Sequence, residues 1–207
     1  MYKSLLVFCI AFCFNKSASA QQPLRLKNNE AGTLQLGLRT DYSFFQHQNF
    51  NNQSQGVGGD MRLLLGKQLN TEWFADYFRG NEGSGFTRSD YHIGWSVMFY
   101  PQNKMRRIQP YVFAGHCFDY SRLIANSDRN VNENRWSAAV QGGVGTHVNI
   151  SLRSNISLSY QYMLHLGNDI EALTDNGMPV IQISDKSTPE SHMLLCLSFN
   201  YKISDLW

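Results

Sequence analysis

Residues 137–164 alternate between apolar and small or polar side chains, and this period of two predicts a β-hairpin. In the first arm Val140 and Val144 share one face; after a turn at 149–153, the second arm continues the pattern with Leu158 on its apolar face. Each arm has about ten residues, which is enough for a tilted strand to cross the hydrocarbon core of a bilayer. A soluble sheet would bury the apolar face, whereas a membrane barrel turns it to lipid and keeps the polar face inside.

The same alternation runs along most of the chain and predicts an all-β protein, an eight-stranded antiparallel up-and-down transmembrane β-barrel. The predicted connections are short after the second, fourth and sixth strands. They are longer after the others, with loops at 46–56, 80–87, 121–135 and 167–190. This is the layout of outer-membrane barrels, whose periplasmic turns are short and whose extracellular loops are long. The predicted strands are residues 33–45, 57–66, 71–79, 88–100, 110–120, 137–148, 154–164 and 191–203.

The first twenty residues have the pattern of a secretory signal peptide. Lys3 provides a positive charge, an apolar segment follows, and the small residues at 18–20 form a cleavage site. Cleavage there would leave a short periplasmic lead at 21–32 and a barrel at 33–207. The mean hydropathy of −0.35 argues against helical spans, which need about 18 or more consecutive apolar residues.

The charge of the chain excludes a nucleic-acid-binding surface. Charged residues make up 16% of the chain, below the roughly 25% that is usual for soluble domains. Removal of the signal peptide takes away Lys3 and Lys16 and no acid, so the formal net charge falls from +2 to zero. No basic stripe for nucleic acid remains. The basic turn at 104–107 would lie in the periplasm, either against anionic headgroups or simply in solvent.

Two cysteines remain after the signal peptide, Cys117 and Cys196. Their strands are not predicted to be neighbours. In an oxidising compartment they would pair only if both side chains point inward and lie close together; otherwise they are two inert thiols.

Several segments resemble the small eight-stranded OmpA/OmpX-type outer-membrane β-barrels. They are the signal at 5–20, the strand start Gln-Pro-Tyr-Val-Phe-Ala-Gly at 109–115, Gly-Gly-Val-Gly at 142–145, and Leu-Ser-Tyr-Gln-Tyr at 158–162. The resemblance covers residues 33–207. It implies the barrel fold and the outer membrane of a Gram-negative-type bacterium, but it does not imply an activity, because fold does not determine function.

Charged and histidine side chains are predicted on the inner faces of the strands. An eight-stranded barrel is just wide enough for side chains to fill, so these groups must pair or meet water. The expected result is a structural network of hydrogen bonds and ion pairs, and the alternative is a gated ion or proton path. The predicted network consists of Arg39, Asp41, Asp60, Arg62, Glu72, Asp76, His92, Asp119 and His147.

The chain is not expected to be an enzyme. Some small outer-membrane barrels act on lipid A with a histidine, a serine and an acid, which must lie within hydrogen-bond reach. None of the six histidines lies in a His-x-Ser sequence, and Ser191 and His192 would point to opposite faces of a strand. No Cys pair at zinc-finger spacing is combined with a His pair at zinc-finger spacing, so no metal or cofactor is predicted.

Aromatic residues gather near the ends of the predicted strands. In a membrane barrel they would form girdles at headgroup depth; in a soluble barrel they would belong to the core. The predicted girdle residues are Tyr42, Phe44, Tyr91, Phe99, Tyr100, Phe118, Tyr120, Tyr160 and Tyr162.

The longest predicted loop, 167–190, is a candidate interaction site outside the cell. Its apolar segment at 178–183 could extend the last strand above the membrane as a ribbon that accepts a partner strand. Its acids could hold divalent cations that bridge lipid phosphates; alternatively, the loop is only a mobile acidic connector. The acids proposed for this role are Asp169, Glu171, Asp175 and Asp185.

The sequence therefore predicts a monomeric outer-membrane β-barrel that contacts membrane lipid, with a structural or surface-interaction role through its extracellular loops. Three alternatives remain at this point: a narrow passive pore, a lipid A-modifying membrane enzyme, and a secreted lipocalin-like soluble barrel.

Overall fold

The computed structural model describes residues 31–47, 50–82, 85–102, 106–167, 170–175, 178–183 and 191–207. The predicted signal peptide and residues 21–30 of the predicted lead lie outside the described residues. No helix in the described part of the chain has the length and apolar character to cross a membrane. The strands are β1 (Thr33–His47), β2 (Phe50–Leu64), β3 (Leu69–Glu82), β4 (Phe86–Phe99), β5 (Ile108–Ala125), β6 (Asn132–Asn149), β7 (Ser154–Leu166), β8 (Ile170–Asp175), β9 (Met178–Ile183) and β10 (Ser191–Asp205).

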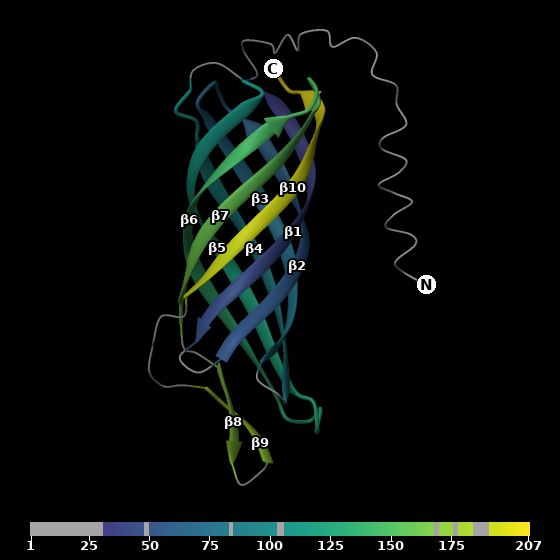
Figure 1. Cartoon of the computed structure of the whole chain (residues 1–207), viewed down its shortest axis with the longest axis vertical. Coiled ribbons are helices and arrows are strands. Elements are labelled where there is room, and N and C mark those ends of the chain that lie inside the picture. Colours follow the sequence, from purple (N-terminus) through teal and green to yellow (C-terminus); the bar gives the residue numbers. More distant parts are fainter. Residues whose placement is uncertain are drawn as a thin grey trace, which may run out of the picture.

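Eight of these strands form a closed barrel, as the sequence predicts. The order round the barrel is β1, β2, β3, β4, β5, β6, β7 and β10, and β10 closes it by pairing with β1. All neighbouring barrel strands are antiparallel. Figure 1 shows the strands tilted steeply round a tall barrel. Closure satisfies the backbone hydrogen bonds without leaving an open sheet edge in the hydrocarbon.

The alternating side chains face as predicted. On β1, Leu38 is 75% exposed on the outer wall, whereas Arg39 beside it is only 7% exposed in the interior. On β3, whose facing is harder to derive from its aromatic-rich sequence, Trp73 lies outside and Glu72 lies inside. The outer wall is therefore apolar and the interior holds a group of buried charged side chains, which is the arrangement of a barrel in lipid.

The strands extend further on one side of the membrane than the sequence suggests. The short turns and the C-terminus lie at one end of the barrel, and the β8–β9 hairpin lies at the other (Figure 1); by the layout of outer-membrane barrels the hairpin end is extracellular. At that end Gln55 pairs with Tyr42, Phe86 with Ala125, and Ile124 with Asn132. The predicted loops at 46–56, 80–87 and 121–135 are therefore mostly strand, and only the connection after β7 is long.

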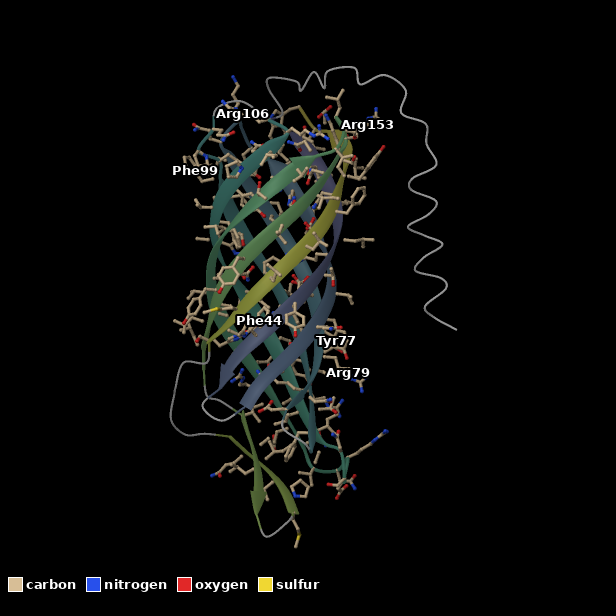
Figure 2. The ribbon with its side chains drawn as sticks, viewed as in Figure 1. Phe44, Tyr77, Arg79, Phe99, Arg106 and Arg153 are labelled. Carbon is tan, nitrogen blue, oxygen red and sulfur yellow. The ribbon has the colours of Figure 1, made fainter. Side chains whose placement is uncertain are left out.

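Several of the predicted girdle aromatics lie on the outer wall near the two ends of the barrel. Phe44 and Tyr77 lie on the outer wall towards the hairpin end and Phe99 lies towards the opposite end (Figure 2). Tyr91 and Tyr120 continue the extracellular girdle, with ring centroids 6.1 Å apart. Tyr100 is not a girdle residue as predicted: it is buried inside the barrel, because the alternation of β4 continues past Phe99 and turns Tyr100 inward as it does Met98.

Candidate functional site

The interior of the barrel contains a layer of ion pairs built on two arginines. Arg39 lies 3.3 Å from Asp41, 3.5 Å from Glu72 and 3.2 Å from Asp76. Arg62 lies 2.5 Å from Glu72 and 3.5 Å from Asp60. All six side chains come from β1, β2 and β3, and the sequence predicted all six on the inner face. We call this set the arginine layer.

Neutral polar groups complete the arginine layer from the opposite wall. Arg62 donates to Ser157 Oγ on β7 at 2.9 Å and to Ser198 Oγ on β10 at 3.2 Å. The Arg39 guanidinium lies 4.7 Å from the centroid of the Phe74 ring. Each arginine is thus held by several partners, which is the condition under which a buried charge is tolerated. The hydrogen bonds of Arg62 therefore connect β2 with β7 and β10 across the lumen.

An apolar cluster fills the lumen on the extracellular side of the arginine layer. It touches the layer through Phe74 and through Cys196, whose Sγ accepts from Arg39 at 3.3 Å. Both cysteines belong to it, and both are free and buried. The inward position Gly94 leaves room for the cluster, since a Cβ there would lie 2.7 Å from the Phe74 ring. The members are Phe74, Phe78, Cys117, Ala139, Met163, Leu194 and Cys196.

A histidine cluster lies on the other side of these apolar residues. Asp119 lies 3.6 Å from His92 and contacts His165. His165 Nε2 is 3.0 Å from His192 Nδ1, and the rings of His92 and His192 stack with centroids 5.7 Å apart. Phe78 packs on His92 at 4.7 Å, which joins this cluster to the apolar one. The sequence predicted His92 and Asp119 as lumen residues but missed the grouping with His165 and His192.

The histidine cluster does not have the geometry of a metal site. His165 already uses one ring nitrogen towards Asp119 and the other towards His192. Among the described residues, no group of three or more His, Cys, Asp or Glu side chains is arranged to hold a metal ion. The arrangement is that of a hydrogen-bonded layer closing the lumen near the extracellular girdle.

His147 lies apart from the other predicted lumen residues, near the periplasmic end. Its Nδ1 is 2.5 Å from Ser157 Oγ and its Nε2 is 2.8 Å from Tyr100 Oη. The Tyr111 ring stacks on it at 4.4 Å. Sequence reasoning missed this Ser–His pair because the residues are partners across β6 and β7 and not neighbours along the chain. Both are buried in the lumen, and Arg62 also donates to the serine, so the chain of hydrogen bonds joins the arginine layer.

The β8–β9 hairpin is packed on the extracellular end of the barrel. One face of it, with Ile170 buried and Ala172 and Ile181 partly buried, contacts Phe86, Leu123 and Ala125 of β4 and β5. The opposite face leaves apolar side chains exposed. These are Leu173 at 41%, Met178 at 68% and Val180 at 39% exposed.

The predicted acidic site in the long connection is only partly described. Glu171 and Asp175 lie in β8, whereas Asp169 and Asp185 lie outside the described residues. The predicted ribbon at 178–183 exists as β9, but it pairs with β8 and does not extend the last barrel strand as predicted. The cause is visible in the packing, since the apolar residues of both short strands are needed to cover Leu123 and Ala125.

Comparison with known proteins identifies the fold. No family model matches the sequence, and no curated protein matches it. The structure is similar to Neisserial surface protein A (TM-score 0.58, 10% identity, 82% of this chain and 97% of that chain). It is also similar to Ail, the attachment invasion locus protein of Yersinia pestis (0.54, 12%, 83% and 99%), and to a major outer membrane protein of Thermus thermophilus (0.56, 9%, 82% and 99%). The chain has the fold of small eight-stranded outer-membrane barrels, and such a barrel fits the predicted outer-membrane location.

Proposed function

We propose that the protein is a sealed outer-membrane barrel that presents its extracellular strand ends and the β8–β9 hairpin to a partner at the cell surface. The observation that carries this proposal is the two-faced hairpin, which is anchored by Ile170 and Ile181 and exposes Leu173, Met178 and Val180. Apolar side chains clustered on an exposed surface are typical of interaction sites. Anchoring reduces the conformational entropy lost on binding, so a rigid hairpin binds better than a free loop.

The filled lumen supports a platform role over that of a passive pore or a ligand-carrying barrel. The arginine layer, the apolar cluster and the histidine cluster follow one another along the barrel, with direct contacts between them. A lipocalin-like carrier would need space for a ligand in the positions that these side chains occupy. The Ser157–His147 pair faces the lumen and is buried, away from the lipid that a lipid A-modifying enzyme would have to reach.

The sealed lumen predicts that the purified protein forms no channels. In planar lipid bilayers the wild-type barrel should produce no stepwise conductance, because ions would have to cross an apolar layer within a low-dielectric lumen. A variant with Phe74→Ala and Phe78→Ala removes the two rings of that layer and serves as the matched comparison. Stepwise currents from the wild type would reject the platform model in favour of a pore.

The exposed hairpin face predicts a cross-linkable partner in living cells. A photoreactive amino acid placed at Gln182, next to the apolar face, should yield a discrete adduct on intact cells. Replacing Leu173, Met178 and Val180 with serine should lower the yield at least about tenfold, because apolar anchors carry much of the affinity of such contacts.

The control for this experiment is a photoreactive residue at Arg153, which lies at the opposite end of the barrel (Figure 2). Its adducts should differ from those at Gln182 and should be unaffected by the three serine substitutions. Heat-modifiable migration in gels would verify that each variant has a closed barrel. If the adduct at Gln182 is missing in the wild type, or survives the serine substitutions, the hairpin is not the binding surface.

A further inference from the structure

A groove of about 400 Å³ runs along the outer wall between the membrane centre and the periplasmic end. Most of its lining consists of outward-pointing apolar side chains of β5, β6, β7 and β10, with Thr146 among them, so it opens to lipid. The pairing of the strands arranges them in rows: Pro110, Thr146 and Leu158 form one row, and Val112, Val144 and Tyr160 form the next. Short side chains at Pro110 and Thr146 leave the wall recessed there.

The apolar surface continues from the groove to the periplasmic turns. The next row towards the turns is Ile108, Val148 and Ile156, and Ile108 is 62% exposed. A chain lying in the groove would therefore contact apolar side chains along its whole course from the membrane centre to the level of the turns. Such continuity fits an acyl chain better than a short polar ligand.

Three arginines lie beyond the periplasmic end of this apolar surface. Arg106 and Arg107 precede β5, and their carbonyl oxygens accept hydrogen bonds from Asn149 at the end of β6, at 2.7 and 2.8 Å. Arg153 lies in the turn that follows β6, and its carbonyl oxygen accepts from Lys202 N at 2.7 Å. All three side chains are exposed, and Figure 2 shows Arg106 and Arg153 at the same end of the barrel as Phe99.

The charge of these three arginines at the periplasmic end is uncompensated within the described residues. None of the three guanidinium groups forms an ion pair with a described carboxylate. Asp205, at the end of the neighbouring β10, is instead held by Lys202 at 2.6 Å and by Thr33 at 2.9 Å. Guanidinium groups bind phosphate through paired N–H donors, so these arginines are suited to an anionic phosphate.

We propose that this groove and its arginines bind one anionic phospholipid of the periplasmic leaflet. One acyl chain lies along the recess at Pro110 and Thr146, and the headgroup phosphate lies among Arg106, Arg107 and Arg153. The leaflet follows from the topology, because the short turns mark the periplasmic end of the barrel. The site is independent of the extracellular hairpin and of the filled lumen.

Retention of lipid by the purified full-length barrel tests the proposal. Protein in a neutral detergent is titrated with phosphatidylglycerol or with phosphatidylcholine of the same acyl chains, and bound lipid is counted by native mass spectrometry. We expect one retained phosphatidylglycerol at concentrations where phosphatidylcholine is not retained. Replacing Arg106, Arg107 and Arg153 with glutamine should weaken retention on the order of a hundredfold, since each basic group near a membrane surface contributes several-fold to binding of anionic lipid.

Matched variants separate this site from general attraction of lipid to charge. Glutamine at Arg79, Arg122 and Arg129 removes three exposed arginines elsewhere on the chain and should leave retention unchanged. Thr146→Phe fills the recess and leaves all three periplasmic arginines intact, so it should lower retention of phosphatidylglycerol. If the Thr146→Phe protein does not form a heat-modifiable barrel, Pro110→Phe is used in its place. Equal retention of the two lipids, stronger retention of lipid A than of phosphatidylglycerol, or retention unaffected by the filled recess would overturn the proposal.

Discussion

Replacing Arg62 with methionine should lower the free energy of unfolding of the barrel by about 3–5 kcal/mol. Arg62 is 3% exposed and is the partner of Glu72 at 2.5 Å and of Asp60 at 3.5 Å. Its removal leaves Glu72, Asp60 and the Ser157 and Ser198 hydroxyls without the guanidinium that they share. Urea unfolding of the barrel in lipid vesicles, followed by tryptophan fluorescence, would measure the loss.

Two further variants make this prediction specific to the ion pair. Methionine at both Arg62 and Glu72 should recover part of the loss, because it also removes one of the two carboxylates that lose Arg62, and Asp60 remains as the other. Methionine at Arg129, which is exposed in the turn between β5 and β6, should change the free energy of unfolding by less than about 0.5 kcal/mol. A loss below about 1 kcal/mol for Arg62→Met alone would mean that water solvates the carboxylates and that the lumen is open.

The barrel itself could be predicted from the sequence because its outer, lipid-facing surface and its inner surface differ in chemistry. Lipid selects apolar side chains outside and the narrow lumen selects mostly polar or small ones inside, so the period of two is visible along most of the strands, although inward residues such as Phe74 and Leu194 interrupt it. Arg39 and Leu38 illustrate the contrast, since they are neighbours in the chain and face opposite environments. The number of barrel strands, their order and their facing within the membrane were therefore all predicted.

The extracellular ends of the strands could not be predicted in the same way. Above the membrane, water solvates both faces of a strand, so the alternation disappears although the backbone pairing continues. Residues such as Gln53 and Gln55 read as a polar loop, yet they pair with Phe44 and Tyr42 of β1. The hairpin was missed for a related reason: the partner of β9 is β8, six residues of mixed character with no period of their own.

The interior site was predicted as a set of residues but not as a geometry. The inward facing of Arg62 and Glu72 follows from the alternation, whereas their pairing depends on the register between β2 and β3. His165 of β7 contacts Asp119 of β5 across the lumen, and His192 joins them through His165 because β7 and β10 are neighbours round the closed barrel. Tyr100 was assigned to the girdle because it follows Phe99 at a strand end, although the alternation that turns Met98 inward also turns Tyr100 inward.

The outward direction of the Leu158 side chain predicts the second large effect on the stability of the barrel. Leu158 is 46% exposed on the outer wall of β7, and Gln161, three residues further on, is 3% exposed inside. Replacing Leu158 with arginine should lower the free energy of unfolding by about 2–4 kcal/mol, which is the cost of a basic side chain facing lipid near the middle of the bilayer. The same urea unfolding in vesicles would measure it.

Leu152→Arg is the matched control, because Leu152 is similarly exposed but lies in the turn before β7. Near the interface an arginine should cost only about 0–1 kcal/mol, so the two variants separate depth in the membrane from the change of residue type. Single cysteines introduced at 158 and 161, in a protein without Cys117 and Cys196, give an independent measurement of facing. A lipid-soluble thiol reagent should label position 158 and leave 161 unmodified. The reverse labelling, together with a small loss of unfolding free energy for Leu158→Arg, would mean that β7 turns its apolar face to the interior and that the barrel is not a membrane barrel.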